Sequence, residues 1–410
     1  MNNLTSPTSK ASKLIVQKYG GATLATPEQI KQVAKRIHHL HKSGTQVVVV
    51  VSAMGQTTNQ LIELARQVSP NPHLRELDML LTVGERMSMS LLSMALNDLG
   101  SSAISFTGSQ AGILTDDSHV NASIIDVKAF RVEAALKEHK IVILAGFQGV
   151  SPVTKEITTL GRGGSDTSAV AMAGYLKADQ CEILKDVDAI YTADPKIVKD
   201  AKPIHQLNYS QLLEMTKWGA KVLHSKSVEM AEIKNVQLFV GAATELESKS
   251  PQPSGTVISN NTLAAQQKNF LSVNSYSIVF KMQFTKSTAA SLSEYKKEFY
   301  DYINSKQIAT PDILYIEDNF FYVTGPKENL DLIQKIDFKN SKFKLITTEL
   351  CSVSLTCGQT PSIESTNVAL KKLSEKNIPF EKQVNSENNI NFFLDQKTKA
   401  EVIQLLHSLI

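Results

Sequence analysis

Residues 47–59 read VVVVVSAMGQTTN, a run of five valines followed by small and hydroxyl-bearing residues. A β-branched run without polar alternation predicts a strand that is buried on both faces, as in parallel sheets covered by helices. Further apolar runs lie at 14–17, 141–144 and 181–184, between helical patterns at 26–42, 57–67, 76–99 and 166–176. The first 260 residues therefore predict an α/β fold with a mostly parallel sheet between layers of helices.

The pattern changes after residue 240, where a stretch rich in Ser, Pro and Lys at 245–255 indicates a boundary. Beyond it we expect two small α+β modules in a βαββ style. Their strands are expected at 277–284, 313–316, 320–323, 352–355, 380–384 and 390–393, and their helices at 292–304, 365–376 and 398–410. The predicted organisation is a disordered lead at 1–12, a domain at 13–262, and modules at 268–340 and 344–410.

The composition is that of a globular protein. The 410 residues include 43 Lys+Arg and 40 Asp+Glu, a net charge of +3, and 42% are hydrophobic. These values exclude a wholly disordered, collagen-like or coiled-coil chain and predict no nucleic-acid or membrane partner. Three cysteines are too few for a disulfide scaffold, and the N-terminus lacks the apolar segment of a signal peptide. We therefore expect a cytoplasmic protein.

Two polar segments directly follow expected strands. KYGGAT at residues 18–23 has glycines that let backbone N–H groups approach phosphate oxygens, beside a lysine that supplies a point charge. A tight turn with a surface lysine explains the same residues. The small residues after the valine run occur where open α/β sheets bind ligands, although they equally suit a helix cap.

A third segment, TVGER at residues 82–86, lies inside the expected helix 76–99. Glycine within a helix costs about 1 kcal/mol relative to alanine, which a close approach by a backbone or a ligand would offset. Glu85 lies among apolar positions and needs a cation, either a ligand amine or Arg86. An exposed Glu85 paired with Arg86 is the alternative. Core packing is expected for the methionines Met79, Met87, Met89 and Met94.

The most specific segment is TLGRGGSDTS at residues 159–168. Three glycines flank Arg162, which is suited to bind a carboxylate through two hydrogen bonds. Ser165 and Asp166 open a helix whose N-terminus favours an anion. Asp166 would accept from a substrate ammonium or hold a lysine in place. A helix cap alone would explain Ser165 or Asp166, but not the glycines and the arginine.

Two later segments complete the set. KDVDAIYTADP at 185–195 has acidic residues and a tyrosine that suit a ribose, an adenine or a metal-bound phosphate. WGAKVLH at 218–224 offers Lys221 for a nucleotide phosphate, whereas His224 is expected to be structural. The chain has no Walker A, Rossmann, Ser-His-Asp or HExxH signature, so ATP-dependent chemistry would need another phosphate cradle.

Over about residues 13–260 the chain resembles the aspartate kinases. Eight segments occur in the family's order: KYGGAT, VVVVVSAMGQTTN, LLTVGERMS, FTGSQAGILT, AGFQGV, TLGRGGSDTSAVAMA, DVDAIYTADPKIV and WGAKVLHSKSVEMA. The resemblance implies the αβα sandwich of the amino acid kinases. It also implies phosphoryl transfer from MgATP to the side-chain carboxylate of L-aspartate. The product, 4-phospho-L-aspartate, leads to lysine, threonine, methionine and diaminopimelate.

The resemblance also implies residue roles. Lys18 would neutralise the transferring phosphoryl group, and Asp166 would orient that lysine. Arg162 would bind the α-carboxylate of aspartate and Glu85 its ammonium, and the implied aspartate-binding residues are Thr58, Glu85, Arg162 and Ser165. The implied ATP-binding residues are Lys18, Tyr19, Gly20, Gly21, Lys185, Asp186, Tyr191, Lys196 and Lys221. The cofactors expected are ATP and Mg²⁺, with no metal ligands from the protein.

The chain departs from the family pattern in two regions. Ala22-Thr23 replaces Thr-Ser, Lys185 replaces a small hydroxyl residue, and Lys196 replaces an arginine. The C-terminal part should form two ACT modules that bind lysine or threonine, but their turn glycines are largely missing at 285–287 and 358–363. We therefore expect modules that mainly form a homodimer or higher oligomer, with weak or altered feedback.

Two alternative functions remain. Kinases of glutamate, acetylglutamate, carbamate or UMP share the fold and the lysine–glycine loop, but they do not usually combine GERMS with LGRGGSD or carry tandem C-terminal modules. An amino-acid-sensing regulator would keep the ligand pocket without turnover. The joint presence of Lys18, Glu85, Arg162 and Asp166 favours an enzyme.

Overall fold

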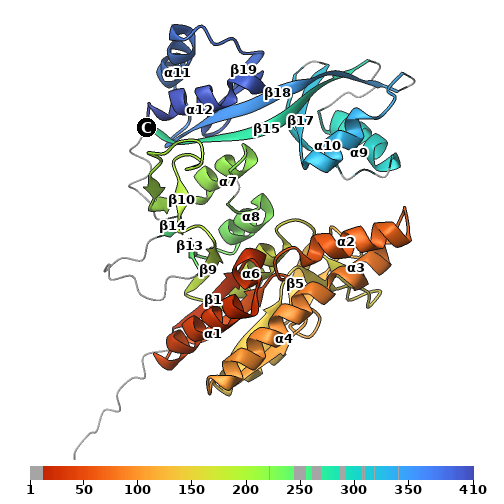
Figure 1. Ribbon diagram of the computed structural model, residues 1–410, viewed down its shortest axis with the longest axis vertical. Coiled ribbons are helices and arrows are strands. Elements are labelled where there is room, and N and C mark those ends of the chain that lie inside the picture. Colours follow the sequence, from red (N-terminus) through yellow and green to blue (C-terminus); the bar gives the residue numbers. More distant parts are fainter. Residues whose placement is uncertain are drawn as a thin grey trace, which may run out of the picture. The chain divides into compact units, whose positions relative to one another are not determined.

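The computed structural model describes residues 13–220, 222–243, 255–260, 269–285, 292–306, 308, 310–317, 319–339 and 341–410. The chain divides into two compact units (Figure 1). The first consists of Met1–Ile190, Pro203–Tyr209 and Val222–Thr262, and the second of Tyr191–Lys202, Ser210–Lys221 and Leu263–Ile410. Two short segments from within the expected first domain thus pack with the C-terminal unit. The expected lead at 1–12 lies outside the described residues.

The first unit is built on an eight-stranded sheet in the order β12-β14-β13-β9-β1-β2-β6-β3. Its strands are β1 (Leu14–Tyr19), β2 (Gln46–Val51), β3 (Ala103–Phe106), β6 (Ile141–Ala145), β9 (Gln180–Lys185), β12 (Gln206–Leu207), β13 (Leu238–Ala242) and β14 (Gly255–Ile258). All neighbours from β13 to β3 are parallel, whereas β14 is antiparallel to β13. The valines of β2 are fully buried, so the predicted parallel α/β sheet is confirmed.

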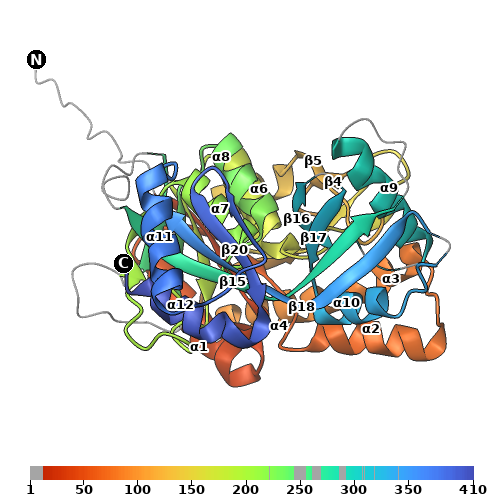
Figure 2. The same ribbon diagram turned by 90° about the horizontal axis from the view of Figure 1, so that it is seen from above.

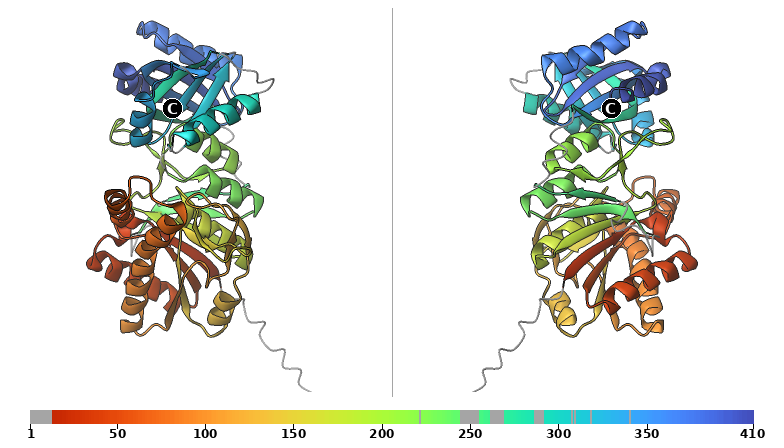
Figure 3. Two further views of the ribbon diagram at one scale, coloured as in Figure 1. Left: turned by 90° about the vertical axis from the view of Figure 1, so that its right-hand side faces the viewer. Right: turned by 90° about the vertical axis from the view of Figure 1, so that its left-hand side faces the viewer.

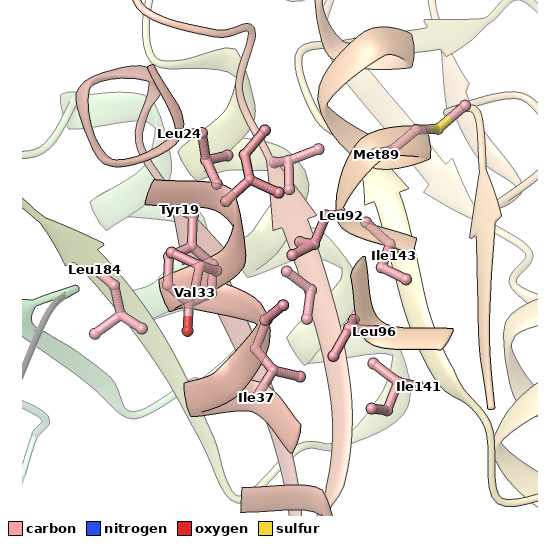
Figure 4. Close-up of a cluster of buried hydrophobic side chains, with 14 of the residues drawn as sticks. Tyr19, Leu24, Val33, Ile37, Met89, Leu92, Leu96, Ile141, Ile143 and Leu184 are labelled. Atoms are coloured by element: carbon pink, nitrogen blue, oxygen red, sulfur yellow. The ribbon is translucent and has the colours of Figure 1, made fainter. Parts of the chain in front are cut away.

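Helices cover both faces of this sheet (Figure 3). The helices of this unit are α1 (Pro27–Lys42), α2 (Thr57–Val68), α3 (Leu74–Leu81), α4 (Val83–Asp98), α5 (Phe130–Lys137), α6 (Gly164–Leu176) and α8 (Ser225–Ile233). A capping box at Thr26 and Gln29, with Pro27 in the first turn, fixes the start of α1. α1 and α4 pack over one face through the cluster in Figure 4, and α6 packs on the other face against β1, β2 and β9.

The expected single helix at 76–99 is wrong, because α3 ends and α4 begins at Thr82. Gly84 therefore lies in the first turn of α4, where an added Cβ would come within 2.6 Å of the Cβ of Ala53. This close approach explains the glycine, although the neighbouring atom belongs to a side chain and not to the backbone or ligand that the sequence led us to expect. Met89 is buried, but Met79, Met87 and Met94 are exposed, so the expected core role is wrong for these three.

A smaller sheet in the order β5-β4-β7-β8 was not predicted. Its strands are β4 (Ile113–Thr115), β5 (Ile124–Val127), β7 (Gln148–Val150) and β8 (Ile157–Thr159). Strands of three or four residues carry too little alternation to be recognised in a sequence. β8 ends at Thr159, and it therefore sets the position of the glycine-rich turn that follows. Two other short strands, β10 (Ile190–Tyr191) and β11 (Pro203–Ile204), pair with each other.

The second unit contains one six-stranded antiparallel sheet in the order β16-β17-β15-β18-β20-β19. Its strands are β15 (Phe270–Phe284), β16 (Asp312–Glu317), β17 (Phe320–Thr324), β18 (Phe343–Cys357), β19 (Lys382–Asn385) and β20 (Asn389–Asp395). Its helices are α7 (Tyr209–Lys217), α9 (Leu292–Ser305), α10 (Lys327–Gln334), α11 (Ile363–Glu375) and α12 (Lys399–His407). The sequence predicted this alternation but neither α7 nor α10.

The two C-terminal modules share their central strands. β15 and β18 are each 15 residues long and pair along their lengths (Figure 2). The second half of β15 forms a βαββαβ unit with α9, β16, β17, α10 and the first half of β18. The second half of β18 forms another with α11, β19, β20, α12 and the first half of β15. The division at 340–344 expected from the sequence thus falls at the start of a strand that serves both modules.

Candidate active site

The loops at the carboxyl ends of β1, β2, β6 and β9 are joined by backbone hydrogen bonds. Gly20 N donates to Leu184 O (3.3 Å), and Ser52 N donates to Tyr19 O (3.2 Å). Gly55 N donates to Gly21 O (3.0 Å), and Gly146 N donates to Val51 O (3.0 Å). An added Cβ on Gly21 would lie 2.6 Å from the carbonyl oxygen of Ala53, so this contact requires glycine. The loops form one connected surface at the edge where open α/β sheets bind ligands.

A buried ion pair lies beside this surface. Lys18 of β1 places Nζ 2.6 Å from Oδ1 of Asp166, which lies in the first turn of α6. Burial raises the pKa of the Asp166 carboxyl, but the positive charges of Lys18 and Lys185 and the hydrogen bond from Lys18 outweigh it, and the net effect is a lowered pKa. Asp166 is therefore ionised at neutral pH and holds Lys18 in place. Holding a lysine was one of the two roles predicted for Asp166.

Lys185 at the end of β9 adds a second, half-buried cation. Its Nζ donates a hydrogen bond to the carbonyl of Val222. Burial lowers the pKa of Lys185, and the neighbouring Lys18 lowers it further, whereas Asp166 opposes the shift. Two lysines surround one carboxylate here, so the local charge favours an anion such as a phosphate.

The N-terminus of α6 is open to a ligand. Gly163 forms its N-cap in the left-handed region (φ 71°), and no side chain caps the helix. An added Cβ there would collide with the side chain of His224, which caps α8 by accepting from Lys226 N. The predicted structural role of His224 is therefore confirmed. Gly164 N donates to Gly161 O (3.1 Å) and Thr167 N to Gly163 O (3.0 Å). The two backbone N–H groups between them, together with the helix dipole, make this end suited to an anion.

Glu85 in the first turn of α4 is buried, with 3% of its surface exposed. Its Oε1 accepts a hydrogen bond from Ala53 N (3.1 Å), whereas its Oε2 has no partner among the described residues. Burial raises the pKa of Glu85 to about 7, against the lowering effect of the hydrogen bonds. The alternative of an exposed Glu85 paired with Arg86 is wrong. A buried carboxylate with one free oxygen suits a cationic ligand group.

The remaining predicted aspartate-binding residues lie on the same loops. Thr58 is half-buried in the first turn of α2, and Ser165 is buried in the first turn of α6. Arg162 is exposed in the turn between β8 and α6, and it has no hydrogen bond or ion pair to any described residue. Its guanidinium is therefore available to a ligand.

The predicted nucleotide-binding residues are more scattered. The side chain of Tyr19 is buried in the cluster of Figure 4 and donates to Gln17 Oε1, so only its backbone reaches the strand end. Asp186 is exposed after β9. Tyr191 and Lys196 belong to the second unit, where Tyr191 is half-buried and Lys196 is exposed. Lys221 lies outside the described residues.

Sequence reasoning missed one carboxylate near the site. Asp78 of α3 is fully buried and accepts three hydrogen bonds from Thr159, Val120 and His119. Its signal was present, since Asp78 lies among leucines and methionines just as Glu85 does. No group of three or more His, Cys, Asp or Glu side chains is placed to hold a metal in the described ranges. In those ranges no helix is long and apolar enough to cross a membrane.

Comparison with known proteins identifies the family of the first unit. A model of the amino acid kinase family matches residues 13–242, more than half of the chain. The chain belongs to the amino acid kinase family. Among curated proteins of this family, the aspartokinase of Mycobacterium tuberculosis (strain ATCC 25618 / H37Rv) is 54% identical over 245 residues, which cover 60% of this chain and 57% of that protein. The aspartokinase of Corynebacterium glutamicum is 56% identical over 227 residues, or 55% and 54% of the two chains. The chain thus aligns with little more than half the length of these relatives.

Solved structures extend the likeness of fold to both units. Aspartokinase III of E. coli, in complex with aspartate and ADP, superposes with a TM-score of 0.75 at 21% identity, covering 97% of this chain and 100% of that one. The aspartate kinase of Synechocystis gives a TM-score of 0.53 at 32% identity, covering 96% of this chain and 69% of that one. The amino acid kinase fold with a C-terminal α+β unit is therefore confirmed.

Proposed function

We propose that this member of the family is an aspartate kinase, which transfers the γ-phosphoryl group of ATP to the side-chain carboxylate of L-aspartate. The observation that carries the proposal is that a positively charged region and a negatively charged group both lie at one edge of the sheet. The buried Lys18–Asp166 pair with Lys185 provides a cationic region, and Glu85 provides a carboxylate with a free oxygen. A triphosphate needs the first, and the ammonium of an amino acid needs the second.

The phosphoryl donor is assigned to the surface formed by Gly20, Gly21 and Lys18. Lys18 offsets the charge that moves from ATP to the acceptor, and Asp166 keeps its ammonium directed at that position. MgATP is the substrate, and the magnesium ion enters with the phosphates. Because phosphoryl transfer needs little covalent chemistry from the protein, positioning and charge supply most of the rate enhancement. The other residues assigned to the nucleotide are Lys185, Asp186, Tyr191, Lys196 and Lys221.

The acceptor is assigned to the loops after β2 and β8 and to α4. Arg162, which has a free guanidinium, binds the α-carboxylate, and Glu85 binds the ammonium. Thr58 and Ser165 donate hydroxyl hydrogen bonds to the same molecule. The side-chain carboxylate of aspartate is then left to face the phosphoryl group. Curated relatives named aspartokinase at 54–56% identity support this substrate over glutamate, carbamate or UMP.

We propose residues 13–262 as the kinase domain and 268–340 and 344–410 as ACT-like modules that form a homodimer or higher oligomer. The Gly358 turn after β18 supports altered feedback. Gly358 N donates to Asn269 O, and Gly358 O accepts from Gln211 Nε2, so backbone groups that an effector would need are already bonded. The other turn, at 285–287, lies mostly outside the described residues. The free, buried cysteines Cys181, Cys351 and Cys357 support a cytoplasmic location.

Release of ADP from MgATP by the purified full chain tests the proposal. The reaction is run with L-aspartate, with L-glutamate and without an amino acid. Aspartate-dependent release, with little from glutamate, is the expected result. Folded protein that binds ATP but releases no ADP with any acceptor would replace the kinase with the sensor alternative. Release with glutamate but not aspartate would reassign the substrate.

A further inference from the structure

A fully buried aspartate links the two proposed clamps of the amino-acid substrate. Asp78 lies in α3, which meets α4 at Thr82, so it precedes Glu85 by seven residues. Its Oδ1 accepts from Thr159 Oγ1 (2.6 Å) and from Val120 N (3.0 Å), and its Oδ2 lies 2.6 Å from His119 Nδ1. Thr159 is also fully buried and ends β8, three residues before Arg162.

The turn that Asp78 holds lies directly against the arginine loop. Val120 has a φ of 67°, which is unfavourable for a β-branched residue and has to be imposed by its surroundings. The Asp78–Val120 hydrogen bond supplies such a constraint. An added Cβ on Gly161 would come within 2.9 Å of Asn121 Oδ1 and 3.2 Å of Val120 O. Ala122 N also donates to Thr159 O (2.9 Å). The strained turn therefore forms the support on which Gly161, and hence Arg162, rests.

Arg162 needs this support because it has none of its own. Its side chain is exposed and has no hydrogen bond or ion pair among the residues that the structure describes. Its position is set by its backbone, which Asp78 supports through Thr159 and through the turn at 119–121, which lies against Gly161. The same carboxylate belongs to the α3–α4 pair that carries Glu85. One side chain thus determines the spacing between the group proposed for the carboxylate and the group proposed for the ammonium.

We propose that Asp78 is a positioning residue for the amino-acid acceptor, setting the spacing of Glu85 and Arg162 and so the affinity for L-aspartate but not for ATP. This inference rests on the proposed function. It predicts that KM for L-aspartate changes while KM for MgATP does not, which a general loss of stability would not produce. Among the described residues, no hydrogen bond or ion pair joins Lys18, Gly20 or Gly21 to Asp78 or its partners.

Three variants of the full chain test the inference, namely Asp78→Asn, Thr159→Val and Thr115→Val. The asparagine keeps the shape but replaces one acceptor oxygen by an NH₂ group, and the valine at 159 removes one donor from the same carboxylate. Thr115→Val is the matched control. It removes a buried hydroxyl hydrogen bond of the same length, Thr115 Oγ1 to Thr158 Oγ1 (2.6 Å), in the same small sheet but away from Asp78.

We expect Asp78→Asn to raise KM for L-aspartate by about tenfold or more and Thr159→Val to raise it by about threefold, with KM for MgATP changed by less than about twofold. Thr115→Val should leave both constants within about twofold. Equal effects of Thr159→Val and Thr115→Val, or parallel rises in both constants, would reduce Asp78 to a structural residue. If Asp78→Asn does not fold, the comparison of the two threonine variants decides.

The wild-type protein separates this inference from the function on which it rests. If it shows no aspartate-dependent ADP release, the proposed function fails, and titration calorimetry with L-aspartate then decides the inference. Binding by wild type that weakens in Thr159→Val but not in Thr115→Val would support the role of Asp78. Wild type that binds no L-aspartate would overturn both proposals. Turnover by wild type with unchanged KM values in the variants would overturn the Asp78 inference alone.

Discussion

Replacing Glu85 by glutamine tests whether the buried, ionised carboxylate of Glu85 lowers the free energy of unfolding of the native protein. The amide can keep the acceptor that Ala53 N uses at 3.1 Å and places an NH₂ group where Oε2 has no partner. The two side chains have nearly the same shape. The variant therefore changes charge and proton affinity while leaving the packing of α4 in place.

The magnitude follows from the raised pKa of Glu85, about 7 against its ordinary value of 4.5. A shift of one unit corresponds to about 1.4 kcal/mol, so the ionised form costs the native state about 3 kcal/mol. Because the folded state raises the pKa, the native state binds the proton more tightly than the unfolded state does. Proton binding to Glu85 therefore stabilises the native state fully below about pH 4.5, and this stabilisation is lost as the pH rises to about 7. The variant does not titrate, so its advantage in unfolding free energy should grow by about 2 kcal/mol between pH 5 and pH 7 and level off by about pH 8.

Urea denaturation at pH 5, 6, 7 and 8, followed by circular dichroism, measures this difference. Tryptophan fluorescence is unsuitable, because the single tryptophan, Trp218, lies in the second unit. Glu63→Gln, which neutralises an exposed carboxylate of α2, is the control and should show no such trend. A difference between Glu85→Gln and wild type that stays constant from pH 5 to pH 8 would show that Glu85 is not perturbed by burial and would refute the reasoning.

Three further predictions concern the same chain. Lys18→Ala should lower kcat by about 10²-fold or more because one preorganised charge is lost, whereas the exposed Lys13→Ala should not; equal rates in steady-state assays would remove Lys18 from catalysis. Gly21→Ala should cost about 1–3 kcal/mol in unfolding free energy and raise KM for MgATP, since its Cβ would overlap the carbonyl of Ala53, and an unchanged KM would separate this loop from the nucleotide. Lysine and threonine, singly or together, should give no sub-millimolar inhibition of ADP release, because both backbone groups of Gly358 are bonded within the protein, and potent inhibition would contradict this.

The sequence predicted the parts of the fold that depend on local pattern. The valine run forms β2 in the buried parallel sheet, as its composition predicted. The glycines at 20–21 follow the parallel strand β1, and those at 161, 163 and 164 lie at the start of α6. The break at Thr82 was missed because the helical periodicity continues across it. The sharing of β15 and β18 between modules was also missed, since pairing partners are determined by tertiary contacts that no local pattern encodes.

The predicted site was incomplete for the same reason. Glu85 and Asp78 carry the same signal, an acidic residue among apolar neighbours, yet the sequence does not say which donors each will meet. Only the fold brings Thr159 and Val120, about 80 and 40 positions away, to the carboxylate of Asp78. The side chain of Tyr19, a residue predicted to bind the nucleotide, lies in the core, so its nucleotide contact stays a prediction for its backbone groups.

The buried carboxylates of the first unit differ in how many of their oxygens accept hydrogen bonds. This difference distinguishes a carboxylate that stabilises the fold from one that is available to bind a ligand. Asp78 has a donor for each oxygen, so it needs no ligand and serves to hold the chain. Glu85 Oε2 has no partner, and Asp166 Oδ1 faces Lys18 at 2.6 Å without a hydrogen bond of good geometry. Among the described residues of this unit, all the buried side-chain atoms without a hydrogen bond belong to Glu85, Arg86 and Asp166. Glu85 and Arg86 lie in the first turn of α4, and Asp166 lies in the first turn of α6 with Lys18 as its ionic partner. An unpaired buried group costs about 1–3 kcal/mol, and the cost of Glu85 Oε2 is explained if a cationic ligand group completes it.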